Sequence, residues 1–556
     1  MDLITFNKRL ILYIVIVFLP FLVFTQNNTN NDVFLSEFSI FNEELGDFLS
    51  KSNNDEIRKN YNNFKKSIDS FSLNHKKKIK SIIYLMYEKR FRPKPHFNKF
   101  IETLLSINNL KNNQLLDQWL FTTQNILENH GGKKLLLFCV FSNQLINKKL
   151  RSNKAIEWIF ESENFSFDYY MNQPVAKFDS IFNLKCITSG SSIMIERTKG
   201  MYFPFSSTWE GNDGFVFWDK FGLSKDSVFA RMSTYEIDFK KSIILADSCL
   251  FYNKYEFNYP INGKLEHKTV SNRQSSKYPK FTSYNMNIEI KNIFPNIDYR
   301  GGYRLSGNNF IAYGGEYAEA KIVFKRDGKD IFIANANKFN ISSDRIASLN
   351  SGVKIFFDSD SLYHSNIEFT YINSERKLKL YVDRSKSSGS PMFNTYHKIT
   401  MDFELLEWHI DQDVITFGSL PGASQSDVFF ESLNMYSESR YYKLQGIDDI
   451  HPLIRIKNYI KEKGERKFYV QDFARYAKFS WEVAQPYLIT LADQGFLYYD
   501  FGEHRVSVLP LFDSYLDAAS GIGDYDVISF KSTVNKGQYL TQNQNLLINA
   551  ALNIKT

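Results

Sequence analysis

Hydrophobic and polar residues alternate through most of residues 178–417, in short runs separated by turn residues. A period of two is typical of β-strands with one buried face. Asp327-Gly328 separates two such runs and predicts a hairpin, because both residues tolerate positive φ. Runs beginning near 353, 366 and 377 follow one another without helical crossovers. We therefore predict an elongated β body over residues 162–445, built as a β-solenoid or as a long folded-over sheet.

The spacing of apolar residues changes to three or four before this body. Residues Ile82, Ile83 and Met86 show this helical period, and breaks follow at 92–95, 108–113 and 131–132. This pattern predicts a helical domain of several antiparallel helices over residues 26–161. The fold class expected is therefore α+β and multidomain.

A basic pair, Lys8-Arg9, precedes an unbroken apolar run at 10–24 and then a polar stretch. This order is typical of a secretory signal peptide. We predict a signal peptide over residues 1–25, with cleavage between Thr25 and Gln26. The alternative is an uncleaved membrane anchor, although the run is shorter than the ~20 residues of a bilayer span. Either way we expect export, to the periplasm, the outer membrane or the cell surface.

Residues 446–510 predict helix, strand, helix, helix and hairpin in that order. This order resembles a winged helix-turn-helix, although Pro486 would kink its third helix. That helix has no Lys or Arg between Ser480 and Gly495, while Glu482 and Asp493 make it acidic. An acidic helix repels phosphates, so we expect a module for protein interaction or spacing and no nucleic-acid partner.

Residues 511–556 return to the β pattern and stop in mid-pattern. Because stacked strands need a cap against edge pairing, we expect a truncated segment, the front part of a longer β protein.

Composition adds little to this picture. The formal charge is +7 over 556 residues, which is too small to indicate a nucleic-acid partner. Cys139, Cys186 and Cys249 cannot form a disulfide framework and lack metal-ligand spacing. We expect Cys139 and Cys249, which stand in apolar segments, to be buried free thiols.

Candidate chemistry is sparse. Glu407, His409 and Asp411 share one strand face by the two-residue period. They could bind a metal or act as acid and base, or they could be the solvated face opposite Trp408. Asp358 and Asp360 with His364 could hold a cation or simply make a turn. No phosphate loop, nucleophile elbow or zinc-protease motif is present. We predict no cofactor, no metal site, and no catalytic residues beyond these three candidates.

Several segments resemble long, uncharacterised exported β-rich proteins of Bacteroidota-type bacteria. They are residues 208–211 with 217–218, 235–238 with 246–248, 299–305, and 344–346 with 360–364. The order of strands and turns is also similar to the β-taco folds of lipopolysaccharide-transport proteins. These resemblances imply export and a β architecture, and they carry no activity.

Our leading hypothesis is a non-enzymatic exported scaffold or interaction protein of the cell envelope, with envelope proteins or glycans as partners. The alternative is a polysaccharide-active enzyme, a lyase or hydrolase on a β-solenoid, because stacked β folds often display acids and aromatic rings in a sugar-binding groove.

Overall fold

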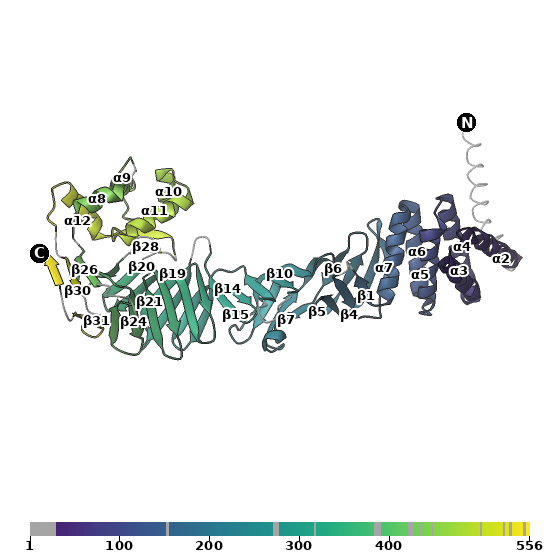
Figure 1. The fold of residues 1–556 in the computed structure, drawn as a ribbon, viewed down its shortest axis with the longest axis horizontal. Coiled ribbons are helices and arrows are strands. Elements are labelled where there is room, and N and C mark those ends of the chain that lie inside the picture. The colour runs from purple at the N-terminus through teal and green to yellow at the C-terminus, as the bar shows by residue number, and fades with distance from the viewer. Residues whose placement is uncertain are drawn as a thin grey trace, which may run out of the picture. The chain divides into compact units, whose positions relative to one another are not determined.

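The structure is a computed structural model of the chain. It describes residues 29–556, without 152–154, 271–276, 316–318, 383–390, 421–427, 434, 447–448, 501–502, 526–528, 533–535, 549–551 and 556. It combines helices with a large antiparallel sheet and has a helical block at its N-terminus (Figure 1). The predicted signal peptide, with Thr25 and Gln26, lies outside the described residues. Two compact units make up the chain: residues 1–216, 232–245 and 268–274, and residues 217–231, 246–267 and 275–556.

The first unit begins with the predicted helices. They are α2 (Thr29–Ser50), α3 (Asp55–Ser67), α4 (Leu73–Glu88), α5 (Asn98–Asn108), α6 (Asn113–Asn129) and α7 (Gly132–Ile146). The apolar faces of α5, α6 and α7 meet at Trp119, whose ring stacks on Phe100 at 5.5 Å and on Phe138 at 6.2 Å. The indole nitrogen of Trp119 donates to the hydroxyl of Ser142 at 3.1 Å, so the buried ring leaves no polar group unsatisfied.

Strands begin earlier than the boundary at residue 161 predicted from the sequence. The strands wholly within the first unit are β1 (Lys149–Arg151), β2 (Glu157–Phe160), β3 (Ser166–Tyr170), β4 (Gln173–Thr188), β5 (Ser191–Phe203), β6 (Thr208–Asn212) and β9 (Thr234–Asp238). The first two fall within the range predicted as helical. In the structure β2 alternates between partly and fully buried residues, as a strand does. Four residues are too few for this period to be recognised in the sequence.

Four further strands contain residues of both units. They are β7 (Phe215–Phe217), β8 (Val228–Met232), β10 (Ile243–Asn253) and β11 (Ile261–Lys268).

The sheet of the second unit contains two antiparallel ladders joined by long shared strands. The shared strands are β14 (Ile297–Ser306), β19 (Arg345–Phe357) and β20 (Asp360–Ile372). Ladder A consists of one half of each with β13 (Ile288–Phe294), β16 (Ala320–Arg326), β17 (Lys329–Ala336), β22 (Met392–Asn394), β23 (Ile399–Asp402), β26 (Val428–Ser432), β30 (Ser529–Ser532) and β33 (Leu552–Lys555). Ladder B consists of the other halves with β12 (Lys280–Ser283), β15 (Asn309–Tyr313), β18 (Lys338–Ile341), β21 (Lys377–Tyr381), β24 (Leu405–His409), β25 (Val414–Gly418), β31 (Lys536–Leu540) and β32 (Asn545–Leu547).

The two ladders face each other across a layer of aromatic rings. Phe332 of ladder A stacks on Phe369 of ladder B with ring centroids 5.5 Å apart, and Phe324 meets Tyr371 at 4.9 Å. All four side chains are fully buried. Register shifts between Ser348 and Val353 mark where β19 passes from one ladder to the other. The space between the ladders is therefore filled where these rings meet.

The predicted hairpin at Asp327-Gly328 is confirmed. These residues have φ of 50° and 77° and connect β16 to β17, which pair from Ala320 and Ala336 to Arg326 and Lys329. Only residues that tolerate positive φ make this tight turn without strain. The hairpin fixes which side chains of both strands face the aromatic layer and which face outward.

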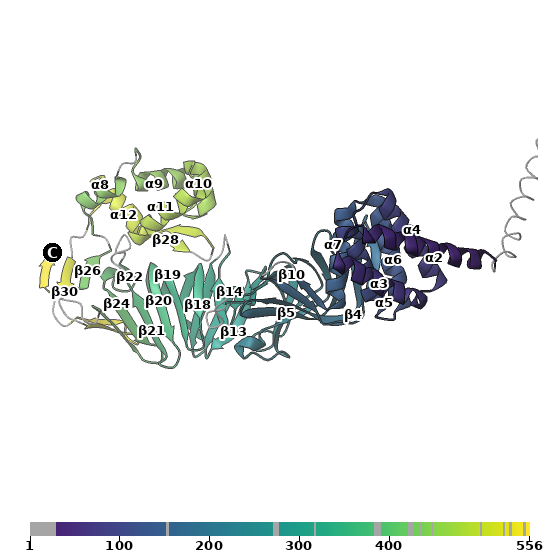
Figure 2. The ribbon, with the colours of Figure 1, turned by 45° about the vertical axis from the view of Figure 1, so that its right-hand side comes forward.

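A helical segment interrupts ladder A, and we call residues 438–519 the insert module. Its elements are α8 (Glu438–Gln445), α9 (Pro452–Lys463), β27 (Lys467–Tyr469), α10 (Val470–Ala477), α11 (Trp481–Asp493), β28 (Leu497–Asp500), β29 (Arg505–Val508) and α12 (Pro510–Ala519). The element order predicted for residues 446–510 is present, and α11 continues through Pro486. Figure 2 shows the module on one side of the ladders.

The module extends beyond the boundaries predicted from the sequence. Phe512, Tyr515 and Leu516 of α12 belong to its hydrophobic core, although residues 511–556 were expected to be β. The α12 helix was missed although its sequence carries helix signals, since Pro510 stands at its first position and Phe512, Tyr515 and Leu516 follow a helical spacing; with ten residues it is short between β segments. The module leaves from β26 and returns to β30, and these strands are paired neighbours with Glu431 opposite Ser529.

All three cysteines are buried and free, and burial raises the pKa of each thiol to about 12. The expectation for Cys139 and Cys249 is confirmed, and Cys186 behaves in the same way. Among the described helices, none combines the length and apolar character needed to span a bilayer.

Candidate functional site

Glu407 and His409 lie on the outer face of ladder B, as the strand period predicted, but Asp411 does not share that face, because β24 ends at His409 and Asp411 lies in the turn after it. Each of the three is held by neighbouring groups. Glu407 lies opposite Lys379 on the adjacent strand, and its carboxylate is 2.7 Å from Lys377 Nζ and 3.5 Å from Lys379 Nζ. His409 Nδ1 is 3.2 Å from the carbonyl oxygen of Glu375. Arg376 donates to both carboxylate oxygens of Asp411, at 2.5 and 2.9 Å.

These contacts set the protonation of the two acids. Burial alone would raise the pKa of Glu407, but the hydrogen bond and charge of Lys377, with Lys379, lower it below its usual value. The hydrogen bond from Arg376 likewise lowers the pKa of Asp411. Both groups are ionised and neutralised by cations, Glu407 in a cross-strand ion pair on the sheet face and Asp411 in a pair between two turns. Neither of these two carboxylates is therefore a proton donor near neutral pH, and both are already paired with cations.

The second candidate cluster does not converge. Asp360 accepts from Thr395 Oγ1 at 3.0 Å, whereas His364 is buried further along β20 and its Nδ1 accepts from the Asn366 amide at 3.1 Å. In the part of the chain that the structure describes, no three His, Cys, Asp or Glu side chains are grouped so as to hold a metal ion.

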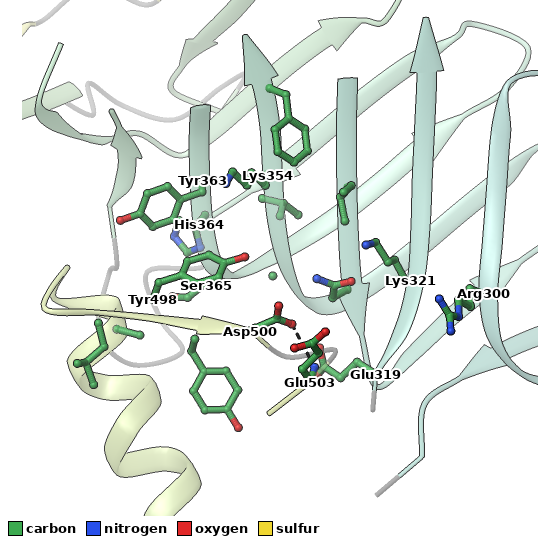
Figure 3. A pocket seen from close by; sticks show the side chains of 18 of the residues that line it. Arg300, Glu319, Lys321, Lys354, Tyr363, His364, Ser365, Tyr498, Asp500 and Glu503 are labelled. Atoms are coloured by element: carbon green, nitrogen blue, oxygen red, sulfur yellow. Dashed lines mark hydrogen bonds between the residues drawn. The ribbon is translucent and has the colours of Figure 1, made fainter. Parts of the chain in front are cut away.

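A different site, which the sequence did not indicate, lies between the outer face of ladder A and the insert module. It is a cleft of about 350 Å³, and we call it the module cleft (Figure 3). Volumes of roughly 300–1,000 Å³ are typical of small-molecule sites. One wall comes from β14, β16, β17, β19 and β20, and the other from the end of α11, β28 and the turn after it.

Strand alternation places the groups of the sheet wall. On β16, Lys321 points outward because Ala320 and Ile322 are buried in the aromatic layer, and on β19 Lys354 points outward between Val353 and Ile355. The ammonium of Lys354 lies 5.1 Å from the ring centroid of Phe356 and 5.8 Å from that of Tyr498. Burial lowers the pKa of Lys354. Among the described residues, neither Lys321 nor Lys354 has a carboxylate within 4 Å.

The module wall is fixed by contacts at one end of the cleft. The buried hydroxyl of Ser365 on β20 donates to the carboxylate of Asp493, the last residue of α11. Tyr498 of β28 meets Tyr363 of β20 edge to face, with ring centroids 5.8 Å apart. Gly495 has φ of +83° and its Cα hydrogens face the ring of Phe393, where a Cβ would lie 2.5 Å from the nearest ring carbon. Only glycine allows both this backbone conformation and this close approach.

Two carboxylates of different elements approach each other inside the cleft. Figure 3 shows Glu319, just before β16, beside Asp500 of the module. Burial raises the pKa of Glu319 to about 8, and the negative charge of Asp500 contributes to the rise. A carboxyl with this pKa is protonated for most molecules at neutral pH.

Two buried polar atoms of the cleft lack a hydrogen-bond partner among the described residues. They are Oε2 of Glu319, just before β16, and Oδ1 of Asn335 on β17. Buried polar atoms are nearly always hydrogen-bonded in folded proteins. The cleft thus holds two unused hydrogen-bonding atoms and two cations that have no carboxylate partner among the described residues.

No family model matches this chain, and comparison with curated proteins and with solved structures also gave no match.

Proposed function

We propose that the chain is an exported scaffold or interaction protein of the cell envelope, whose β body carries the insert module as a contact surface. The observation that supports this most directly is the filled interior between ladders A and B. Phe332 and Phe369 stack there without any exposed surface. Because the interior between the ladders is filled, a partner would contact the outer faces of the sheet or the insert module.

The finer architecture is part of the same proposal. We propose a folded-over, β-taco-like sheet, because β14, β19 and β20 each contribute one half to ladder A and the other to ladder B. Successive coils of a β-solenoid would instead pair in parallel, and the described registers of this sheet are antiparallel. For the insert module we propose a winged-helix-like fold, supported by the three-stranded sheet β27-β29-β28 beside α9, α10 and α11.

A role in protein contact fits this module better than nucleic-acid binding. The helix that would enter a DNA groove is α11, which begins with Glu482 in its first turn and has no basic residue in its last. Its C-terminal end is fixed to β20 by the bond between Ser365 and Asp493. An acidic helix with one end against a sheet offers phosphates no cationic surface.

Fractionation of the native cell tests this proposal. The full-length chain with a C-terminal tag is expressed from its own promoter, and periplasm, membranes and cytoplasm are separated. External protease is added to intact cells in parallel. We expect the tag in the envelope fractions, in a form lacking the first 25 residues by mass. Full-length chain confined to the cytoplasm would contradict the proposal.

The alternative, an enzyme acting on polysaccharides, loses two of its first candidates because Glu407 and Asp411 are ionised in ion pairs with Lys377 and Arg376. The module cleft carries the observation that favours it, because burial and the nearby charge of Asp500 raise the pKa of Glu319 to about 8, which suits a general acid. Release of reducing ends or of unsaturated sugars from acidic polysaccharides by the purified chain, abolished in Glu319→Gln, would establish it.

A further inference from the structure

We propose that the module cleft binds an acidic saccharide, a pyranose ring that carries a carboxylate, such as a hexuronic acid. The site is composed of the outer face of ladder A and the insert module, and it needs both. The proposal concerns binding and does not depend on export, so its test is separate from cell fractionation.

The sheet wall indicates the negative charge of the ligand. Lys321 and Lys354 both line the cleft, and neither has a carboxylate partner within 4 Å among the described residues. Lys354 is half-buried between the rings of Phe356 and Tyr498, where an unpaired ammonium loses hydration. Its lowered pKa has this cause. A carboxylate placed beside it would replace the missing hydration with a charge-assisted hydrogen bond.

The unused polar atoms indicate that the same ligand also makes hydrogen bonds. Oδ1 of Asn335, which can only accept, and Oε2 of Glu319, which donates or accepts with the protonation of its carboxyl, are buried in the cleft without a partner from the described residues. Hydroxyl groups of a sugar ring satisfy such acceptors, and a simple anion such as acetate or phosphate monoanion supplies few or no donors for them. The carboxylates of Asp500 and Glu503, which also line the cleft, are further acceptors of the kind that hydroxyls use.

Aromatic side chains complete the match to a ring-shaped ligand. Tyr363 and Tyr498 line the end of the cleft where Lys354 lies (Figure 3), and the ring of Phe356 lies against Lys354 there. Their faces and edges can cover the C–H groups of a pyranose while the polar groups around them bind its hydroxyls. The volume of about 350 Å³ lies at the lower end for ligand sites, which suits one or two sugar residues.

Titration calorimetry on the purified full chain tests the proposal with three matched probes. Glucuronate carries both the ring and the charge, glucose carries the ring alone, and acetate carries the charge alone. We expect glucuronate to bind at least about tenfold more tightly than either of the others. Equal affinity for glucuronate and acetate, or for glucuronate and glucose, would overturn the proposal, as would no detectable binding of glucuronate.

Variants locate the binding. Lys354→Met and Lys321→Met should each weaken glucuronate about tenfold and leave glucose unchanged, because each removes one cation from the sheet wall. The control is Lys338→Met, an exposed lysine of ladder B outside the cleft. Thermal melting of each variant shows whether the fold is retained, and Lys321→Arg, which keeps the charge, should restore binding. Unchanged glucuronate affinity in both folded methionine variants would refute the assignment.

Discussion

Ladders A and B have outer faces built by the same strand alternation, yet they hold their acidic side chains in opposite states. On ladder B, Glu407 pairs with Lys377 at 2.7 Å and its pKa is lowered. On the ladder A side, Glu319 is buried under the insert module, and its pKa is raised to about 8. The difference comes from what lies above each face, because cross-strand cations neutralise one carboxylate and the module removes water from the other.

The contact between module and sheet can be broken at one glycine. Gly495→Ala should lower the free energy of unfolding of the second unit by about 3 kcal/mol. The reason is that alanine is strained at this positive φ and that its methyl group clashes with the ring of Phe393. The matched control is Gly464→Ala, where φ is +74° and nothing lies within 4 Å of the new Cβ. The control should cost about 1 kcal/mol. Urea unfolding of both variants measures the difference, and equal losses would mean that the module does not press on Phe393.

The state of Glu319 gives a stability change that depends on pH. Its pKa is 4.5 in an unfolded chain and about 8 in the fold, so the folded state holds the extra proton between these values and loses stability as pH rises through them. Glu319→Gln removes this penalty and should stabilise the protein by up to about 5 kcal/mol at pH 9, with no effect at pH 4. Chemical unfolding at both pH values measures it. A gain at pH 4 equal to that at pH 9 would contradict the buried, protonated carboxyl.

The buried hydrogen bond at the edge of the cleft should contribute less. Ser365→Ala removes the donor to Asp493 and should cost about 1–2 kcal/mol, because a buried carboxylate loses one of its hydrogen bonds. We expect faster amide exchange in α11 and β28 by mass spectrometry. Ser359→Ala, at an exposed serine before the same strand, is the control. Identical exchange in the two variants would show that Ser365 does not hold the module.

The smallest effect is expected on ladder B. Glu407→Gln should cost about 0.5 kcal/mol at pH 7, as expected for a partly exposed ion pair. Because the pKa of Glu407 is lowered in the fold, this contribution is present above its ordinary value of 4.5 and disappears as pH falls below the folded value. The variant and the wild type should therefore converge as the pH falls below the folded pKa of Glu407. If Glu407→Gln stabilised the protein at pH 7, Glu407 would not be stabilised in its charged form, and the predicted difference from Glu319 would be wrong.

Local pattern was sufficient for much of the sheet. The Asp327-Gly328 turn was predictable because its positive φ values suit few other residue pairs. The shared face of Glu407 and His409 was predictable from alternation alone, and both lie on the outer face of ladder B as expected. The helices of the first unit followed from their period, although β2 was too short to distinguish from them.

The module cleft could not be predicted in this way. Alternation correctly puts Lys321 and Lys354 on an outer face, but the same pattern describes any solvated strand. What makes their surroundings unusual is Tyr498, which is more than 140 residues further along the chain. The buried acidity of Glu319 has the same origin, because Asp500 comes from the module. Contacts of this range are set by tertiary packing, which a single sequence does not display.

Because Glu431 and Ser529 face each other as partners in neighbouring strands, the intervening stretch starts and finishes at nearly one spot on the ladder. The insert module is therefore attached as a long loop is, and a short turn could replace it without shifting the register of any strand. Genetic exchange at this position could replace one module with another while ladders A and B stay unchanged. Each exchange would replace the wall of the module cleft that the insert module contributes, whereas the outer face of ladder B would be unchanged.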